Sequence, residues 1–448
     1  MATEENTILK GGILSPLIKF TIPMLLATLL QGLYGAVDLI VVGKYCSTSS
    51  VAAVSNGSQV IFTVTAIVIG LTMGATVVVG RHIGAGDRDA AAKTVAATAK
   101  LFSLLAIALS LALLLLTVPI TRALKVPEAA VEQTVAYLRI CSVGMLLVVP
   151  FNAVSGLFRG TGDSKSPLVF MAIACAVNIV LDLVLVGIFK LDAAGAAIAT
   201  VFAQAVSVVF SLIKIKRGGL KFRVSKESFR DTSKIERQLI EVGGPIALES
   251  GLVSLSFLLI MGIFNRLGLI ASASYGIAEK LYLFLSIVPA SFLSSLSAFV
   301  AQNEGAKQGK RAVEALKIAM ALSFCFGIGI FLLTFFRGDL LARFFTNETA
   351  VIAQCKEYLR GVSVEYLIIS INYCFLGYFN GIGSTRFVMA VGLITTFLVR
   401  IPLSYYLSSL PDTNMFTIAL AVPAAAAVSL VLCSLYFVYV RKRRLSYK

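Results

Sequence analysis

Asn178 and Asp182 are four residues apart inside an apolar stretch that runs from about residue 168 to residue 189. Residues at this spacing share one face of a helix, one turn from each other, and an apolar stretch of this length is typical of a membrane span. A carboxylate near the middle of a span costs about 2.5–3.5 kcal/mol to insert, so it is kept where it faces a protein interior or a water-filled cavity. The pair is therefore a candidate site for a proton, an ion or a charged ligand. A structural hydrogen bond between helices is the alternative.

A second carboxylate lies in the first apolar run of the chain, which covers about residues 13–42. Asp38 follows Gln31 and Tyr34, and the spacing of four places the Tyr34 phenol beside the carboxylate on a helix. Earlier in the run, Pro23 removes one backbone hydrogen bond and allows the helix to bend. Because Asp38 lies close to the end of the run, an interfacial carboxylate is the other interpretation.

The composition indicates a polytopic membrane protein. Of 448 residues, 58% are hydrophobic and 14% charged, with a mean hydropathy of +0.90, whereas a soluble protein carries about 25% charged residues. Twelve apolar runs are long enough to span a bilayer. They cover about residues 13–42, 51–79, 92–116, 134–157, 168–189, 193–213, 240–264, 271–300, 312–336, 350–379, 387–408 and 415–440. The first is too long for the apolar core of a cleavable signal peptide, so we expect it to be retained.

The net charge of +16 comes from 39 Lys and Arg against 23 Asp and Glu. Basic residues gather in the loops after every second run and in the polar stretch 214–238, although the loops after the third and ninth runs also carry some. The positive-inside rule therefore predicts a multi-pass protein of the plasma membrane, the inner membrane of a bacterial cell, with both termini cytoplasmic. We expect residues 214–238 to form a basic cytoplasmic linker, partly an amphipathic helix on the anionic leaflet. No nucleic-acid-binding module is visible.

Metal and nucleotide chemistry are not indicated. The seven cysteines lack CxxC spacing and His82 is the single histidine, so we interpret the cysteines, Cys175 among them, as small packing residues. The glycine-containing connector at residues 80–89 lacks the Lys-Ser/Thr ending and the preceding strand of a phosphate loop. An intramembrane enzyme is disfavoured because HExxH and a paired Ser and His are missing. We expect no cofactor and no enzymatic activity.

The two halves of the chain are an internal repeat. Matching residues of the two halves are 221 positions apart in one continuous register. Tyr137-Leu138-Arg139 matches Tyr358-Leu359-Arg360, and the glycines at 156, 160 and 162 match Gly377, Gly381 and Gly383. Six spans per half give both halves the same orientation, and such parallel repeats are typical of transporters with alternating access. Duplication without transport is the alternative. The repeat predicts an N-terminal lobe at 1–213, the linker at 214–238 and a C-terminal lobe at 239–448.

The polar residues do not follow the repeat. In the same register, Asn178 and Asp182 correspond to Val399 and Leu403, and Asp38 falls opposite an apolar stretch near residue 259. A pair needed only for packing would be kept on both sides, so we infer a functional role for the carboxylates of the N-terminal lobe.

Taken together, these motifs resemble the multidrug and toxic compound extrusion (MATE) transporters over nearly the whole chain. The motifs are Gln31-x-x-Tyr34-x-x-x-Asp38, Gly80 to Gly86, Arg159-Gly160-x-Gly162-Asp163, Pro245, and Gln302-Asn303-x-Gly305-Ala306. The set of Asp38, Asn178, Asp182 and Thr200 is similar to the prokaryotic branch named after DNA-damage-inducible transporters. The resemblance implies an all-α fold of twelve transmembrane helices in two pseudo-symmetric six-helix bundles.

The resemblance also implies the function, a secondary antiporter that exports cationic or amphipathic compounds in exchange for protons or sodium. It implies that Asp38, Asn178, Asp182, Thr200 and Tyr34 form a cation-coupling network. Pro23 is then the hinge of the first helix. We expect a monomer that binds small-molecule substrates and membrane lipids and no nucleic acid, with the choice between proton and sodium left open.

Five further polar residues are candidates for the substrate cavity: Gln31, Asn152, Gln204, Glu249 and Arg400. Glu249 has no clear carboxylate partner in the tenth span, where Glu365 lies toward the outer end, so a sodium site in the C-terminal lobe is not expected. Arg400 is interpreted first as structural and second as a substrate contact. A lipid-linked oligosaccharide flippase of the same superfamily is the runner-up function, and a passive channel is disfavoured by the repeat.

Overall fold

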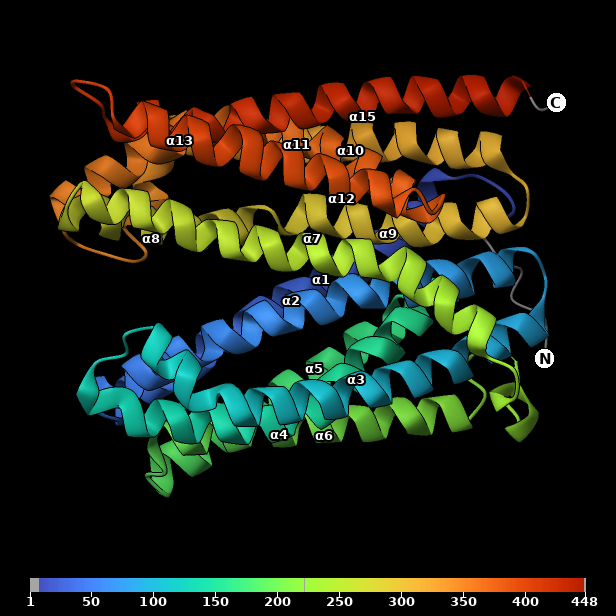
Figure 1. Cartoon of the computed structure of the whole chain (residues 1–448), viewed down its shortest axis with the longest axis horizontal. Helices are drawn as coiled ribbons and strands as arrows, with labels where there is room; N and C mark the ends of the chain where they lie inside the picture. The colour runs from blue at the N-terminus through green and yellow to red at the C-terminus, as the bar shows by residue number, and fades with distance from the viewer. Residues whose placement is uncertain (1–7, 221, 447–448) are drawn as a thin grey trace. The chain divides into compact units, whose positions relative to one another are not determined.

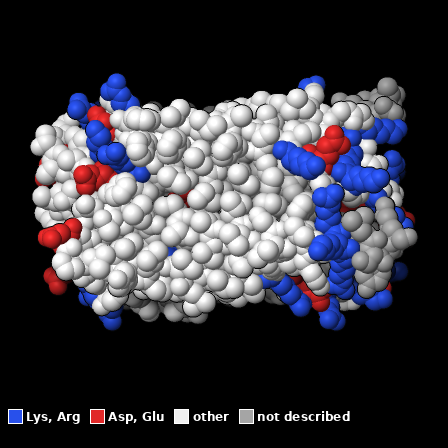
Figure 2. Space-filling model, turned by 90° about the horizontal axis from the view of Figure 1, so that it is seen from above, with Lys and Arg blue, Asp and Glu red and all other residues white. Residues whose placement is uncertain are grey.

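The structure is a computed structural model that describes residues 8–220 and 222–446, and over this range it contains helices and turns without a β-strand. Twelve helical spans of 24 to 37 residues are long and apolar enough to cross a membrane. A helix satisfies its own backbone hydrogen bonds, which is the condition for crossing an apolar layer. On the face shown in Figure 2, charged side chains gather toward the helix ends and the surface between them is almost uncharged. The predicted fold class is confirmed.

The helices form two compact units. The N-terminal unit contains Lys19–Ala247, and the C-terminal unit contains Leu248–Lys448 together with the residues up to Ile18. The divisions therefore fall inside the first and the seventh spanning helices. The lobe boundaries at 213 and 239 stay predictions.

In the N-terminal unit, α4 packs against α2, α3 and α6, while α5 packs against α6; Figure 1 labels these helices. The α5 helix continues directly into a π-helical segment, η1. The elements are α1 (Leu14–Tyr45), α2 (Thr48–Gly84), α3 (Arg88–Ala123), α4 (Glu128–Gly160), α5 (Lys165–Asp182), η1 (Leu183–Ile188), α6 (Asp192–Lys216), the 3₁₀ turn η2 (Lys226–Phe229) and the first part of α7 (Ser233–Arg266).

In the C-terminal unit, α11 takes the central place and packs against α8, α9, α10, α14 and α15. The eleventh span is again interrupted by a π-helical segment, η3. The elements are α8 (Leu269–Leu285), α9 (Ile287–Gly305), α10 (Gly309–Ala342), α11 (Thr349–Gly381), α12 (Thr385–Leu393), η3 (Ile394–Arg400), α13 (Ile401–Ser408), α14 (Met415–Ala419) and α15 (Ala421–Ser446).

The sequence repeat is also a repeat of contacts. Thr76 Oγ1 donates a hydrogen bond to the Gly156 carbonyl at 3.0 Å, and Ser297 Oγ donates to the Gly377 carbonyl at 3.2 Å. Both pairs join the second and fourth spans of their unit, and each member is 221 positions from its counterpart. The two units therefore share one packing scheme, in which glycines let a hydroxyl of the neighbouring helix reach the backbone.

The connector after α2 differs from the expectation, whereas the basic linker does not contradict it. The α2 helix continues to Gly84, so the first half of the connector predicted at residues 80–89 is helical; the backbone keeps its i to i−4 bonds after the apolar run has ended. In the described part of the basic linker, the helical residues are the end of α6, the four-residue η2 and the first turns of α7, and the amphipathic helix on the anionic leaflet stays a prediction. Lys100 of α3 binds this linker, because its Nζ donates to the Phe229 carbonyl at 2.7 Å and to Thr232 Oγ1 at 2.8 Å.

The segment before α1 is held by the C-terminal unit. Arg311 of α10 donates from Nε to the Ile8 carbonyl at 3.0 Å, from Nη2 to the Lys10 carbonyl at 3.2 Å and from Nη1 to the Gly11 carbonyl at 2.7 Å. Because α1 belongs to the N-terminal unit from Lys19 onward, the chain passes from one unit to the other within the first turns of α1, shortly before Pro23.

Candidate functional site

A polar cluster inside the N-terminal unit contains all five residues that were predicted to couple a cation. Thr200 Oγ1 of α6 donates to Asp38 Oδ2 of α1 at 3.1 Å, and the Tyr34 hydroxyl donates to the Thr200 carbonyl at 3.0 Å. The Asp38 carboxylate also lies beside Asn178 and Asp182 of α5. Three helices thus converge on one carboxylate pair, and the coupling role of the five residues stays a prediction.

Local helix geometry places the α5 half of this cluster. Asn178 and Asp182 lie one turn apart, and both side chains are fully buried (0% exposed). Asp182 is the last α-helical residue before the π-helical segment η1. A π turn widens a helix locally and is frequent at functional sites. The wider turn therefore begins directly after the buried carboxylate.

Several polar atoms of the cluster have no hydrogen-bond partner of good geometry among the described residues. They are Asp38 Oδ1, both carboxylate oxygens of Asp182 and both amide atoms of Asn178. Asp38 is 4% exposed, and across the described chain no Lys, Arg or His forms an ion pair with either carboxylate. Buried polar groups are nearly always satisfied in native proteins, and two neighbouring buried carboxylates cannot both stay charged without a cation. The cluster is therefore chemically suited to bind a proton or a small cation.

The candidate cavity residues are divided between the units. In the N-terminal unit, Gln31 is exposed, Asn152 donates to the Val148 carbonyl of its own helix at 2.8 Å, and Gln204 is 9% exposed with its Oε1 unpartnered among the described residues. In the C-terminal unit, Glu249 is half-buried against Gly392 of the eleventh span, where an added Cβ would lie 2.7 Å from Glu249 Oε1.

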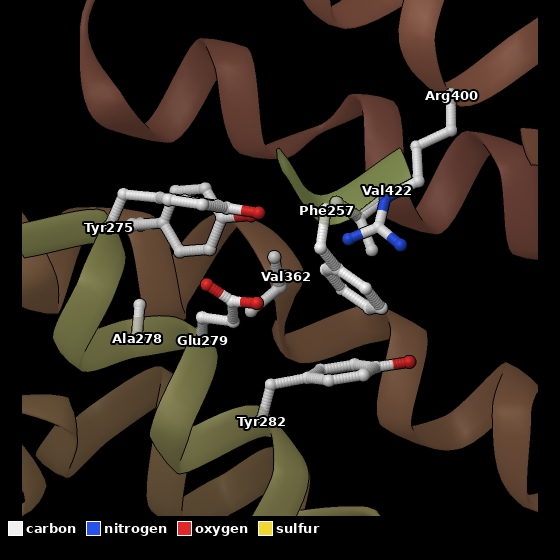
Figure 3. A pocket seen from close by; sticks show the side chains of 9 residues that line it. Phe257, Tyr275, Ala278, Glu279, Tyr282, Val362, Arg400 and Val422 are labelled. Atoms are coloured by element: carbon white, nitrogen blue, oxygen red, sulfur yellow. The ribbon is translucent and has the colours of Figure 1, made fainter. Parts of the chain in front are cut away.

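Arg400, one of the predicted cavity residues, lines a cavity of the C-terminal unit whose other lining residues were not predicted (Figure 3). Its guanidinium carbon lies 4.9 Å from the centre of the Phe257 ring. The other lining residues are Tyr275, Ala278, Glu279, Tyr282, Tyr358, Val362 and Val422. A local signal was present in the chain, because Glu279 has tyrosines four residues before and three residues after it inside an apolar run. This is the spacing that drew attention to Asp38.

Among the described residues, no group of three or more His, Cys, Asp and Glu side chains is arranged to hold a metal ion. His82 lies near the end of α2 and Cys175 is buried in α5, on different helices.

Twelve membrane-spanning helices in two repeated halves, with buried carboxylates at spanning depth, define a polytopic membrane transporter. The MatE family model matches residues 23–184 and again residues 245–406, once in each half. The chain belongs to the MatE family, the multidrug and toxic compound extrusion transporters. The resemblance inferred from the sequence motifs is confirmed. The prediction of a multi-pass membrane protein is also confirmed.

Named relatives agree with this assignment. The chain is 26% identical over 435 residues to the "Probable multidrug resistance protein YoeA" of Bacillus subtilis, covering 95% of the chain and 93% of the relative. It is 23% identical over 410 residues to the "Multidrug export protein MepA" of Staphylococcus aureus, covering 90% and 88%. A solved structure described as "Crystal structure of MATE in complex with MaL6" superposes with a TM-score of 0.92 over the full length of both chains at 20% identity. That likeness shows the fold.

Proposed function

We propose that this chain is a secondary antiporter that exports cationic or amphipathic compounds in exchange for protons or sodium ions by alternating access. The observation that carries the proposal is the buried pair of Asp38 and Asp182, which has unpartnered oxygens and no basic ion-pair partner in the described structure. Carboxylates inside a membrane are costly, and a pair of this kind is explained by a function in which it binds a cation.

The mechanism follows from charge balance. A proton or sodium ion taken up from outside neutralises the pair, allows α1 to bend at Pro23 and weakens the hold on a cationic substrate. Release of the ion inside restores the negative charge and returns the transporter to its starting state. One charge moved across 100 mV is worth about 2.3 kcal/mol, or a roughly 50-fold concentration ratio, so one exchanged ion is enough to drive export without ATP.

The test is efflux of ethidium from vesicles that contain the purified protein, with a pH gradient or a sodium gradient imposed one at a time. The expected result is saturable efflux driven by one of the gradients in the absence of ATP. A strict requirement for ATP would refute the antiporter. Non-saturable flux without a gradient would indicate a channel, and lipid translocation without ethidium efflux would indicate a flippase.

The proposal includes a monomer in the plasma membrane with both termini cytoplasmic, supported by the distribution of basic residues over alternate loops. Single Lys44→Cys and Lys226→Cys variants are expected to react with an impermeant maleimide from opposite sides of the membrane. The exposed Cys325 is first replaced by serine. Burial raises the pKa of the Cys46 thiol to about 11, so its background reaction is slow at neutral pH. Labelling of both positions from one side would overturn the orientation.

A further inference from the structure

Two lysines from distant parts of the N-terminal unit lie over one tyrosine ring. Lys44 and Tyr45 are the last two residues of α1, and Lys190 lies in the short connector between η1 and α6. The Nζ atom of Lys44 is 5.6 Å from the centre of the Tyr45 ring, and the Nζ atom of Lys190 is 5.5 Å from the same centre. Tertiary packing therefore brings together two positive charges that are far apart in the sequence.

Basic residues are rare in this part of the chain. Lys44 is the only Lys or Arg in residues 20–80, and Lys190 is the only one in residues 166–213. In the register of the repeat, their positions in the C-terminal unit are taken by Asn265 and Pro411. The shared scaffold thus does not need the lysine pair of Lys44 and Lys190, and the pair has a role that belongs to the N-terminal unit.

The lysine pair has no carboxylate counter-ion in the described part of the chain. The acidic side chain closest in sequence to Lys190 is Asp192, whose Oδ1 accepts a hydrogen bond from Ser50 Oγ of α2 at 3.2 Å. The face of the tyrosine ring attracts each ammonium group, but it does not cancel the repulsion between two like charges. An anion that binds both lysines would relieve this repulsion.

Exposed apolar side chains adjoin the lysine pair. Ile188 and Phe189, directly before Lys190, are 71% and 65% exposed. At the end of a membrane span, exposed apolar side chains contact lipid chains, and the ammonium group of a lysine reaches the level of the headgroups. The surface therefore combines contact area for lipid chains with two positive charges at headgroup level.

We infer that Lys44, Lys190 and Tyr45 form a binding site for the headgroup of an anionic phospholipid. The ammonium groups bind the phosphate oxygens, and the lipid chains lie along Ile188 and Phe189. A zwitterionic phospholipid binds less tightly, because the lysines repel its own ammonium group. The bound headgroup links the end of α1 to the connector before α6, which are the helices that supply Asp38 and Thr200 to the carboxylate cluster.

Quenching of a single tryptophan tests the inference. The sequence contains no tryptophan, so Phe189→Trp reports only on lipid beside the lysine pair, in membranes of brominated phosphatidylglycerol or brominated phosphatidylcholine. We expect the anionic lipid to be preferred, and the preference should fall about fivefold for each of Lys44→Gln and Lys190→Gln, because a lysine near the membrane surface contributes about this factor. Equal quenching by both lipids, or an unchanged preference in the double lysine variant, would overturn the inference.

Lys125 provides a matched control for the loss of one charge. It is exposed, lies in the connector between α3 and α4 at the same end of the unit, and has a φ of 51°, close to the 55° of Lys190. Lys125→Gln is expected to leave the preference at Phe189→Trp unchanged. A fall as large as that in Lys190→Gln would show that the preference follows total charge, and the proposed site would be refuted.

A second measurement separates a lipid from a free phosphate. In detergent, short-chain phosphatidylglycerol is expected to raise the melting temperature of the wild type more than that of the double lysine variant, and glycerol phosphate at the same concentration should raise neither. Equal stabilisation by glycerol phosphate would overturn the lipid as the occupant, and equal stabilisation of both proteins by the lipid would contradict the role of the lysines. Neither measurement uses a gradient or a transported compound, so the outcome is independent of the antiporter test.

Discussion

The N-terminal and C-terminal units share a backbone repeat but differ in the charge that they bury. In the N-terminal unit, α1, α5 and α6 bring Asp38, Asp182 and Thr200 together. In the C-terminal unit, the positions of Asn178 and Asp182 are taken by Val399 and Leu403, and Arg400 follows at once. One unit therefore concentrates negative charge without a basic partner in its described part, and the other places a guanidinium among carboxylates and tyrosines.

This difference separates the requirements of folding from those of function. The glycine and hydroxyl contacts that join the second and fourth spans are the same in both units, because close helix packing in a membrane depends on small residues and backbone approach. Buried ionisable residues are free to differ, because they contribute little to that packing and are costly unless they are used. The repeat preserved the scaffold, and each unit acquired its own polar site.

The largest effect is expected from neutralising the carboxylate pair. Asp38→Asn and Asp182→Asn each remove the charge that a cation must balance, so each is expected to reduce gradient-driven ethidium efflux to the level of empty vesicles. The measurement uses vesicles with equal amounts of folded, inserted protein. Full activity of both variants would move the coupling site out of the N-terminal unit.

Overpacking the shared scaffold is expected to affect both units alike. A Cβ at Gly160 would lie 2.5 Å from the Thr76 carbonyl oxygen, and a Cβ at Gly381 would lie 2.9 Å from the Ser297 carbonyl oxygen. Gly160→Ala and Gly381→Ala should therefore each destabilise the protein by about 1–3 kcal/mol, seen as a lower melting temperature in detergent. Gly35, where the structure leaves open space around an added Cβ, provides the control. A large effect on one side only would show that the packing is not equivalent.

A smaller and again symmetric effect is expected from the paired hydroxyls. Thr76→Ala and Ser297→Ala each leave a glycine carbonyl without its donor from the neighbouring helix. We expect a loss of about 1 kcal/mol in each case, and the double variant should show the sum because the sites belong to separate units. The measurement is thermal unfolding followed by far-UV circular dichroism. Strong non-additivity would contradict the independence of the two contacts.

The smallest effect is expected from Glu249→Gln, which keeps the shape that packs against Gly392 while removing the charge. Efflux should stay close to that of the wild type, because Glu249 has no matching carboxylate network around it. Complete loss in this variant, with Asp38→Asn active, would invert the comparison and place coupling in the C-terminal unit.

Hydropathy predicted the number and order of the spans, and the helices observed are mostly longer at their ends. The α4 helix begins at Glu128 and α7 at Ser233, about six or seven residues before the apolar runs, because the end turns are polar and hydropathy does not register them. The spacing of four residues predicted that Asn178 and Asp182 share one face of a helix. That prediction needed no information from other helices. The contact between Asp38 and Thr200 spans 162 positions of sequence, and spacing carries no information at that range, so its prediction depended on the family resemblance.

The sequence by itself determined a membrane protein of twelve helices, its internal repeat and the asymmetry of its carboxylates, because these depend on composition and on local helical periodicity. Tertiary structure decided which side chains from different helices meet. It joined Thr200 of α6 to Asp38 of α1 and left the oxygens of Asp182 without a partner in the described chain. It also placed Arg400 and Glu279, from helices far apart in sequence, around one aromatic cavity. These contacts between side chains of different helices depend on how the helices rotate and cross when they pack. The apolar face that drives each helix into its bundle does not determine which side chains make them.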